Sequence, residues 1–205
     1  MELLVAMFVA GIVMAGVYSA YYSQQRSFVV QDEVAKMQQN LRAAMFFMAR
    51  EIRMAGCNPT GAADAGIKTK DADTIRFTMD LKGKDADDPA DGDTSDDDED
   101  ITYSLVGSEI KRDTGAGGTP PSVAENIDWL HFDYLDENGA VTASPMQVRS
   151  VQITIVARTG KGVPGYVNND RYYDLQNDDF YDAPGDNNRR KKLSTNIKCR
   201  NLGLL

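Results

Sequence analysis

Residues that usually carry out catalysis or bind zinc are scarce in this sequence. Among 205 residues there are one histidine, two cysteines and one tryptophan. A structural zinc site usually takes four histidine or cysteine ligands at characteristic spacings, so His131, Cys57 and Cys199 do not suffice, and His131 is expected to be a structural or surface residue. The sequence also lacks a glycine-rich phosphate-binding loop and a nucleophile elbow. We therefore predict that the protein is not an enzyme.

Basic residues are not in excess either. The chain has 22 lysines and arginines against 31 aspartates and glutamates, which gives a formal net charge of -9. Ten of these carboxylates lie in residues 85–100, a stretch without a basic residue, so the rest of the chain is nearly neutral. Nucleic-acid-binding surfaces are basic and often carry aromatic residues. Because the sequence shows no such pattern, we predict no nucleic-acid partner.

The first 22 residues contain a long apolar run. Leu3 to Tyr22 has no charged residue, and as a helix rising ~1.5 Å per residue it would cross a hydrocarbon core of roughly 30 Å. A cleaved signal peptide would need a basic start and a shorter apolar core. A buried core helix would have one apolar stripe rather than an apolar circumference. We predict a transmembrane or filament-core half-helix over residues 1–22.

The helix is predicted to continue beyond this segment, because no proline occurs before Pro59. Gly56 is a candidate C-terminal cap, and Pro59 prevents continuation. Residues 23–56 are therefore expected to form the amphipathic half of the same helix, with a stripe that packs on a folded domain. The apolar residues of this stripe are spaced by three and four: Val34, Met37, Leu41, Met45, Met48 and Ile52.

Residues 57–205 are expected to form a globular antiparallel β domain. Apolar and polar residues alternate in several segments, which is typical of half-buried strands. In the first of these, Ile75, Phe77, Met79 and Leu81 are predicted to share one face. The stretch 174–188 is interpreted as a polar loop, and the basic run 189–192 as the exposed start of the last strand. The predicted fold class is α+β, with the long N-terminal helix packed on an antiparallel sheet. The predicted strands cover residues 74–81, 101–105, 127–134, 147–157 and 193–199.

Four segments resemble the type IV pilin-like proteins, and among these the minor pilins of the PilW type. The first runs from ELLVAMFVAG to AGCNPTG, residues 2–61. The others are ITYSLVGSEIKRDTGAGG, AENIDWLHFDYLDENG and RRKKLSTNIKCRNLG. The resemblance covers most of the chain apart from the acidic loop 85–100 and residues 165–188. It implies a pilin-like fold.

The resemblance also implies a role for Glu2. Members of the family are made with a basic leader that ends in glycine, then a phenylalanine that becomes methylated, then a glutamate that pairs with the amino terminus of a neighbouring subunit. Glu2 matches this glutamate, and a carboxylate within an apolar helix bundle needs such a partner charge. Without the resemblance, Glu2 would be interpreted as a solvated residue at the helix start. No leader precedes Glu2 in this sequence, so we expect either a reading frame that begins upstream or a trimmed sequence.

The function implied by the resemblance is that of a minor pilin that helps to prime and assemble a type IV pilus near its tip. The expected partners are the lipid bilayer before assembly, other minor pilins, major pilin subunits, a tip adhesin and the inner-membrane assembly platform. The expected location is the inner membrane, crossed once with a periplasmic C-terminal domain, and then the extracellular pilus. The alternatives are the related minor pseudopilin J of a type II secretion system and a single-pass membrane protein with a calcium-dependent binding domain.

The two cysteines bracket nearly the whole β domain. Outside the cytoplasm, Cys57 and Cys199 are expected to form a disulfide between the helix end and the last strand. In the chain-entropy model such a bridge would stabilise the domain by about 4–5 kcal/mol.

The acidic loop is the densest group of candidate metal ligands. Calcium takes six to eight oxygen ligands, and Asp91, Asp93, Asp96 and Asp98 are the candidates to supply several of them. The spacing does not match an EF-hand, because Pro89 occupies one of its positions. The alternative is a solvated loop that stays extended through its own charge repulsion. Calcium is the one cofactor that the sequence suggests.

Overall fold

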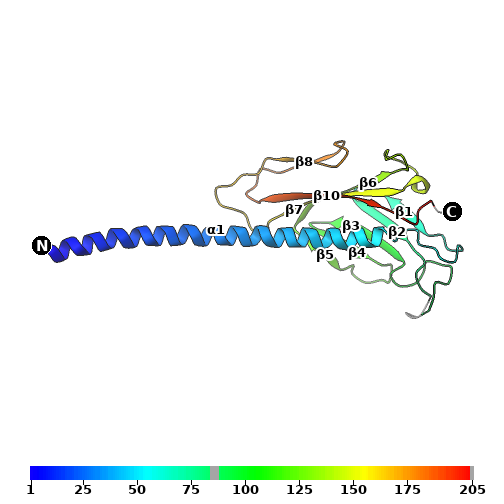
Figure 1. Ribbon diagram of the computed structural model, residues 1–205, viewed down its shortest axis with the longest axis horizontal. Helices are drawn as coiled ribbons and strands as arrows, with labels where there is room; N and C mark the ends of the chain where they lie inside the picture. The colour runs from blue at the N-terminus through cyan, green and yellow to red at the C-terminus, as the bar shows by residue number, and fades with distance from the viewer. Residues whose placement is uncertain (84–87, 204–205) are drawn as a thin grey trace.

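The computed structural model describes residues 1–83 and 88–203, and it consists of one long helix with a β domain along its C-terminal half (Figure 1). This arrangement confirms the predicted α+β fold. The elements are, in chain order, α1 (Glu2–Ile52), β1 (Gly66–Lys70), β2 (Thr74–Thr78), β3 (Asp100–Val106), β4 (Glu109–Asp113), β5 (Ser122–Glu125), β6 (Ile127–Leu135), the 3-10 turn η1 (Pro145–Gln147), β7 (Ser150–Arg158), β8 (Arg171–Tyr173), β9 (Phe180–Asp182) and β10 (Arg190–Lys198).

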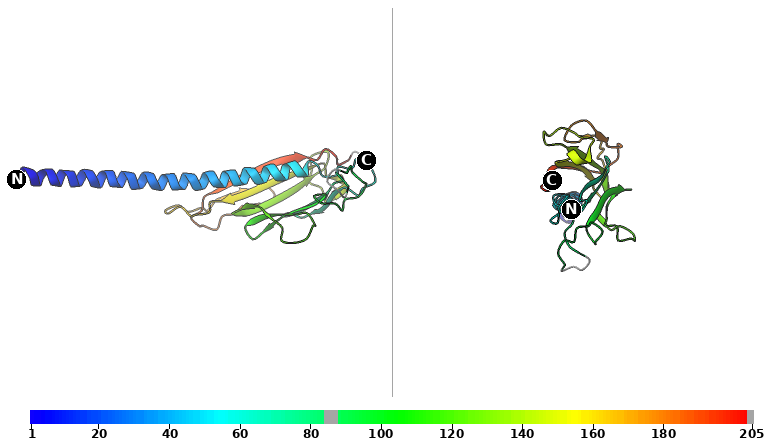
Figure 2. Two further views of the ribbon diagram at one scale, coloured as in Figure 1. Left: turned by 90° about the horizontal axis from the view of Figure 1, so that it is seen from below. Right: turned by 90° about the vertical axis from the view of Figure 1, so that its right-hand side faces the viewer.

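All strand pairs within the described residues are antiparallel. One sheet has five strands in the order β1-β2-β3-β4-β5, a second has the order β10-β7-β6, and β8 and β9 form a separate hairpin. In the left view of Figure 2 most of the strands lie below α1, and β10, drawn in red, overlaps the C-terminal part of the helix. Asn126, with a left-handed φ of 57°, joins the first sheet to the second between β5 and β6. The two larger sheets thus follow one another along the chain and share one core against the helix.

The two halves of α1 have different surroundings. Every residue from Met1 to Val29 is exposed, and this part of α1 is long and apolar enough to cross a membrane. In the second half the predicted stripe is confirmed, because Val34 packs against the core and the residues that follow it in the stripe are buried. The buried residues of α1 are Met37, Leu41, Ala44, Met45, Met48 and Ile52.

The helix ends at Ile52, before the glycine that was predicted to cap it. Its last turn tightens, and the Met54 N–H donates to the Glu51 carbonyl at 2.9 Å. Gly56 does adopt a left-handed φ of 78°. Its N–H, however, donates to the Thr78 carbonyl of β2 at 3.0 Å. The helix therefore ends early, because the Gly56 N–H donates to the five-stranded sheet instead of to a carbonyl within a longer helix.

All five predicted strands differ by one to a few residues from the observed ones, and two of these differences have a clear cause. The strand predicted over residues 74–81 ends at Thr78, because the chain turns where the Asp80 N–H donates to the Cys57 carbonyl at 2.8 Å. Leu81, predicted to share a face with buried residues, is consequently exposed. The strand predicted from residue 147 begins later as β7, because η1 occupies the preceding residues.

The stretch 174–188, interpreted from the sequence as a loop, contains the turn of the β8–β9 hairpin and the whole of β9. The basic run 189–192 is also not fully exposed, because the Arg190 side chain is only 1% exposed. Its Nε donates to Asp128 Oδ2 at 2.6 Å, and Nη1 and Nη2 donate to the two oxygens of Asp186 at 2.5 and 2.7 Å. Arg190 thereby fastens the segment that carries the β8–β9 hairpin to the start of β6.

Candidate functional site

The exposed half of α1 carries most of the exposed large apolar side chains of the described residues. Large contiguous apolar surfaces on soluble proteins mark sites of interaction with another protein or with a membrane. This half of α1 carries apolar side chains around its whole circumference, so a partner has to surround it. Lipid chains and a bundle of similar helices both meet that requirement. Its exposed apolar residues include Leu4, Phe8, Ile12, Val13, Val17, Tyr21 and Phe28.

Glu2 lies at the very start of this surface. It is exposed and is the acidic residue of the first turn of α1, where the helix dipole favours a negative charge. Its neighbours Met1 and Leu3 are exposed apolar residues. In lipid or in a helix bundle this carboxylate would need a cationic partner, because an unpaired buried charge is strongly unfavourable. The geometry therefore leaves Glu2 available to a group from outside this chain.

The acidic loop brings three of its four predicted ligands together. Carboxylate oxygens of Asp91, Asp93 and Asp96 all lie within 4.8 Å of one another. Asp98 is held elsewhere, because its Oδ1 accepts a hydrogen bond from Arg112 at 2.8 Å. The same guanidinium donates to Glu51 at the end of α1 at 3.0 Å. Asp98 thus belongs to the contact between loop and helix rather than to the carboxylate cluster.

Local hydrogen bonds shape the described part of the loop around the cluster, whereas residues 85–87 of the predicted loop lie outside the described residues. Asp93 Oδ1 accepts from the Ser95 N–H and from the Ser95 hydroxyl, both at 2.8 Å, and these bonds lower the pKa of Asp93. Desolvation and the neighbouring charges of Asp91, Asp93 and Glu99 raise the pKa of Asp96. Gly92, with φ 98°, packs so closely on the segment after α1 that an added Cβ would lie 3.1 Å from the Ala62 Cβ. The cluster is therefore held against the body of the protein and carries mutual repulsion.

Two fully buried carboxylates were not predicted, Glu99 within the acidic loop and Asp80 before it. Glu99 Oε1 accepts from the N–H groups of Leu81 and Lys82 at 2.6 and 3.0 Å. Asp80 Oδ2 accepts from the Thr60 hydroxyl at 2.9 Å. The other oxygen of each, Glu99 Oε2 and Asp80 Oδ1, is buried without a hydrogen-bond partner in residues 1–83 and 88–203, as is Asp96 Oδ2. Burying a carboxylate oxygen without a donor is unfavourable, and a bound cation would compensate for it.

Cys57 and Cys199 are free thiols in the structure, so the predicted disulfide is not formed in it. Burial raises the pKa of the Cys199 thiol to about 12. Residues 201 and 202 instead contact the end of the helix and the segment after it without a covalent bond. Asn201 Nδ2 donates to the Met54 carbonyl at 3.3 Å, and Leu202 packs on the segment after α1.

The first half of α1 is apolar and exposed, and its second half covers an antiparallel β domain. This arrangement defines the type IV pilin-like fold. Among solved structures, the chain is similar to a type IV-like pilin from Thermus thermophilus, with a TM-score of 0.52 and 13% sequence identity. The alignment covers 81% of this chain and 98% of that one. No protein-family model matches the chain, and no curated protein matches its sequence. The comparison bears out the pilin-like part of the resemblance, and the PilW type stays a prediction.

Proposed function

We propose that the protein is a minor pilin that helps to prime and assemble a type IV pilus close to its tip. It would first be anchored in the inner membrane with its β domain in the periplasm, and would then enter the filament. Its partners there would be other minor pilins, major pilin subunits, the assembly platform and an adhesin at the tip. The role is structural and involves no catalysis.

The observation that carries this proposal is the unpartnered apolar half of α1 with Glu2 at its start. A helix that is apolar all round is compatible both with lipid and with the centre of a helix bundle, so it can move from one to the other without exposing its surface to water. Glu2 is the only charged side chain of residues 1–25. It makes these two environments unequal, because neighbouring helices with similar starts would supply an amino-terminal cation next to each carboxylate. Pairing of this kind would also set the register of neighbouring helices.

The replacement Glu2→Ala tests this proposal, with Asp32→Ala as the matched control. Both changes remove one carboxylate from an exposed position of α1, but Asp32 lies beyond the apolar half and pairs with Lys36 on the next turn. We expect Glu2→Ala to leave the amount of protein in the membrane unchanged while its amount in sheared filaments falls at least tenfold. Asp32→Ala should leave both amounts unchanged.

The filament fraction and the deletion phenotype separate the alternatives. Mass spectrometry of sheared filaments would identify the amino-terminal residue of the assembled subunit, and a methylated residue upstream of Glu2 would support processing as a prepilin. Deletion of the gene should remove surface pili and twitching. Loss of export of a secreted enzyme with normal pili would instead favour a pseudopilin of a type II secretion system. Wild-type amounts of the Glu2→Ala protein in filaments would contradict the pairing.

We further propose that the acidic loop binds calcium through Asp91, Asp93 and Asp96, without Asp98. Support comes from the closeness of the three carboxylates and from the unpartnered oxygens of Asp96 and Glu99 beside them. Hard carboxylate oxygens suit calcium better than a softer metal. A bound ion would neutralise the repulsion within the cluster and stabilise the loop against the segment after α1.

Thermal unfolding with and without calcium tests this second proposal. A ligand that binds only the folded state stabilises it by about 2.7 kcal/mol at a hundredfold excess over Kd. We expect calcium to raise the Tm of the wild-type protein and of Asp97→Asn, an exposed aspartate outside the cluster. Asp93→Asn should lose most of this increase. An equal response in both variants, or none in the wild type at millimolar calcium, would rule out the site.

A further inference from the structure

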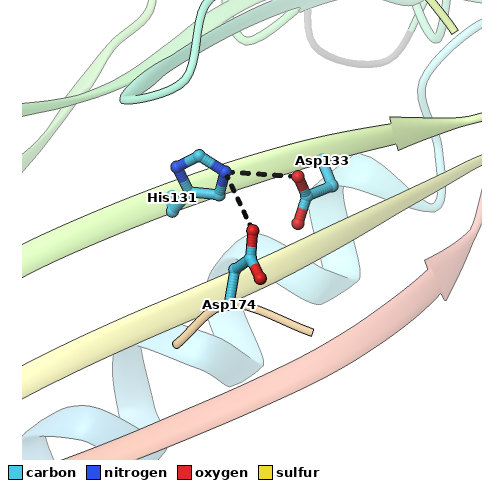
Figure 3. A group of neighbouring side chains, drawn as sticks. All are labelled: His131, Asp133 and Asp174. Atoms are coloured by element: carbon cyan, nitrogen blue, oxygen red, sulfur yellow. Dashed lines mark hydrogen bonds and ion pairs between the residues drawn. The ribbon is translucent and has the colours of Figure 1, made fainter. Parts of the chain in front are cut away.

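The face of the β10-β7-β6 sheet that points away from α1 carries a second group of titratable side chains. Leu130, Phe132 and Tyr134 of β6 face the core, so the alternate residues His131 and Asp133 lie on the opposite face. The segment with the β8–β9 hairpin covers them. In Figure 3, Asp174 from this segment meets His131 and Asp133 from β6. Two parts of the chain that are distant in sequence therefore contribute to one cluster.

This cluster is buried. His131 is 7% exposed, Asp133 9% and Asp174 2%. His131 Nε2 lies 3.2 Å from Asp133 Oδ1 and 3.8 Å from Asp174 Oδ2. One ligand atom from each of the three residues lies within 4.8 Å of the other two. The histidine nitrogen and both carboxylates thus converge on one small volume.

The second oxygen of Asp133 has no visible role in a metal-free protein. Asp133 Oδ2 is buried and has no hydrogen-bond partner in residues 1–83 and 88–203, although Figure 3 shows the carboxylate turned toward His131 and Asp174. A buried carboxylate oxygen of this kind normally has a hydrogen-bond donor or a cation beside it. The unpartnered oxygen indicates that a positively charged group belongs in the cluster.

The spacing of the cluster fits a transition-metal ion. Ligands that surround zinc tetrahedrally at about 2.0–2.1 Å are roughly 3.4 Å from one another, and the two distances from Nε2 lie on either side of that value. Imidazole nitrogen together with carboxylate is a ligand set for zinc and related ions rather than for calcium. Three protein ligands would leave one position for water or for the second oxygen of Asp133.

The surroundings of the cluster match those of a metal-bound histidine. Histidine ligands usually direct their other ring nitrogen to a carboxylate, which orients the ring. His131 Nδ1 lies 3.5 Å from Asp179 Oδ2. Asp174 is also oriented, because its Oδ1 accepts from the Asp178 N–H at 3.1 Å and its Oδ2 from the Asp179 N–H at 3.0 Å. The turn of the β8–β9 hairpin therefore positions Asp174 and His131.

We propose that His131, Asp133 and Asp174 bind one divalent transition-metal ion of the zinc class, which fastens the β8–β9 hairpin to the β10-β7-β6 sheet. This site is separate from the acidic loop and does not depend on the function proposed above. The sequence argument against zinc considered histidine and cysteine ligands alone. The structure adds two carboxylates that complete a different ligand set.

Zinc titration of the full-length protein in detergent, after treatment with a chelator, tests the site. We expect calorimetry to give one zinc per chain, and Asp93→Asn in the acidic loop to bind it equally well. His131→Asn and Asp174→Asn should each weaken binding by at least about a hundredfold, since even outer-shell changes lower metal affinity by about 10–100-fold. Asp170→Asn, which removes an exposed carboxylate of the same segment, should leave zinc binding unchanged.

Trp129 provides a second readout, because its ring centroid is 5.2 Å from that of His131 and it is the only tryptophan of the chain. Paramagnetic Co²⁺ should quench its fluorescence at the same stoichiometry as zinc binding. Should the inner variants fail to fold, Asp179→Asn changes the exposed carboxylate beside Nδ1, keeps the backbone N–H that donates to Asp174, and should weaken binding by about 10–100-fold. No zinc binding at 1 mM, or binding that all these variants leave unchanged, would show that His131 is merely an ion-paired histidine.

Discussion

The buried side chain of Arg190 allows a quantitative test of how the segment 159–189 is attached to the β domain. Replacing Arg190 with alanine removes the cation between Asp128 and Asp186. Asp128, whose side chain is 7% exposed, keeps Arg158 as a partner, whereas Asp186 loses its bidentate partner. Breaking a buried ion pair by removing one side typically costs about 3–5 kcal/mol. Because Arg158 remains, we expect a loss near the lower limit, about 3 kcal/mol.

For a chain of this size, each kcal/mol of destabilisation lowers the Tm by roughly 2–4 °C, so Arg190→Ala should lower it by about 6–12 °C. The assay is thermal unfolding of the full-length protein in detergent at pH 7, followed by circular dichroism. Arg171→Ala is the matched control. Arg171 also forms a bidentate pair, with Asp182, but the two side chains are 46% and 54% exposed, so Arg171→Ala should lower the Tm only slightly.

Arg190→Lys adds a further check, because a lysine keeps the charge but not the planar fork that binds both oxygens of Asp186. We expect a Tm between those of the wild type and Arg190→Ala. If Arg190→Ala and Arg171→Ala lower the Tm equally, burial of the guanidinium does not determine its contribution, and the reasoning is refuted.

Three further predictions concern pH, thiols and the helix end. Arg190 holds the pKa of Asp186 well below its ordinary value of 3.8, so this carboxylate stabilises the folded state above about pH 4 and loses that effect as the pH falls further. The Tm difference between wild type and Asp186→Asn should therefore be constant from pH 7 to 5 and shrink below pH 4. Burial raises the pKa of both thiols, so alkylation at pH 8 should be slow, with Cys57 reacting before Cys199. If the protein denatured without reductant contains no thiol that can be alkylated, the isolated protein forms the disulfide. Gly56→Ala should destabilise the protein by roughly 1–2 kcal/mol in urea unfolding, because φ is positive there and Leu202 Cδ2 lies 2.5 Å from the added Cβ. Gly11→Ala should cause no such loss, because no atom lies within 4 Å of the Cβ added there.

The helix and its apolar stripe could be predicted because both depend on local spacing. Met37, Leu41 and Met48 repeat at helical intervals, and no breaker interrupts them. The end of the helix could not be predicted, since it depends on the hydrogen bond between Gly56 and Thr78 of a later strand. Leu81 was placed on the wrong face for the same reason: alternation continues in the sequence beyond the point where tertiary contacts end the strand.

The carboxylate clusters were predictable only where their members are close in sequence. Asp91, Asp93 and Asp96 come from one loop, and their closeness follows from the sequence alone. Asp98 was grouped with them because nothing in its local sequence indicates that it pairs with Arg112, which lies in β4. The spacing of His131 and Asp133 on one alternating strand was a usable signal, because it places both side chains on one face. Asp174 lies in a distant segment, and no local pattern indicates that it meets them.

Because α1 is one continuous helix, its apolar half and the β domain are joined rigidly. With 51 residues rising ~1.5 Å each, the helix is about 76 Å long, and its second half is fixed in the β domain. A change of about 10° in the tilt of its free half would therefore move the far end of the molecule by roughly 13 Å. Small differences in the tilt of the first turns of α1, relative to lipid or to neighbouring helices, would therefore cause large displacements of the acidic loop. The angle of the free half alone thus determines which neighbours the distant end can reach.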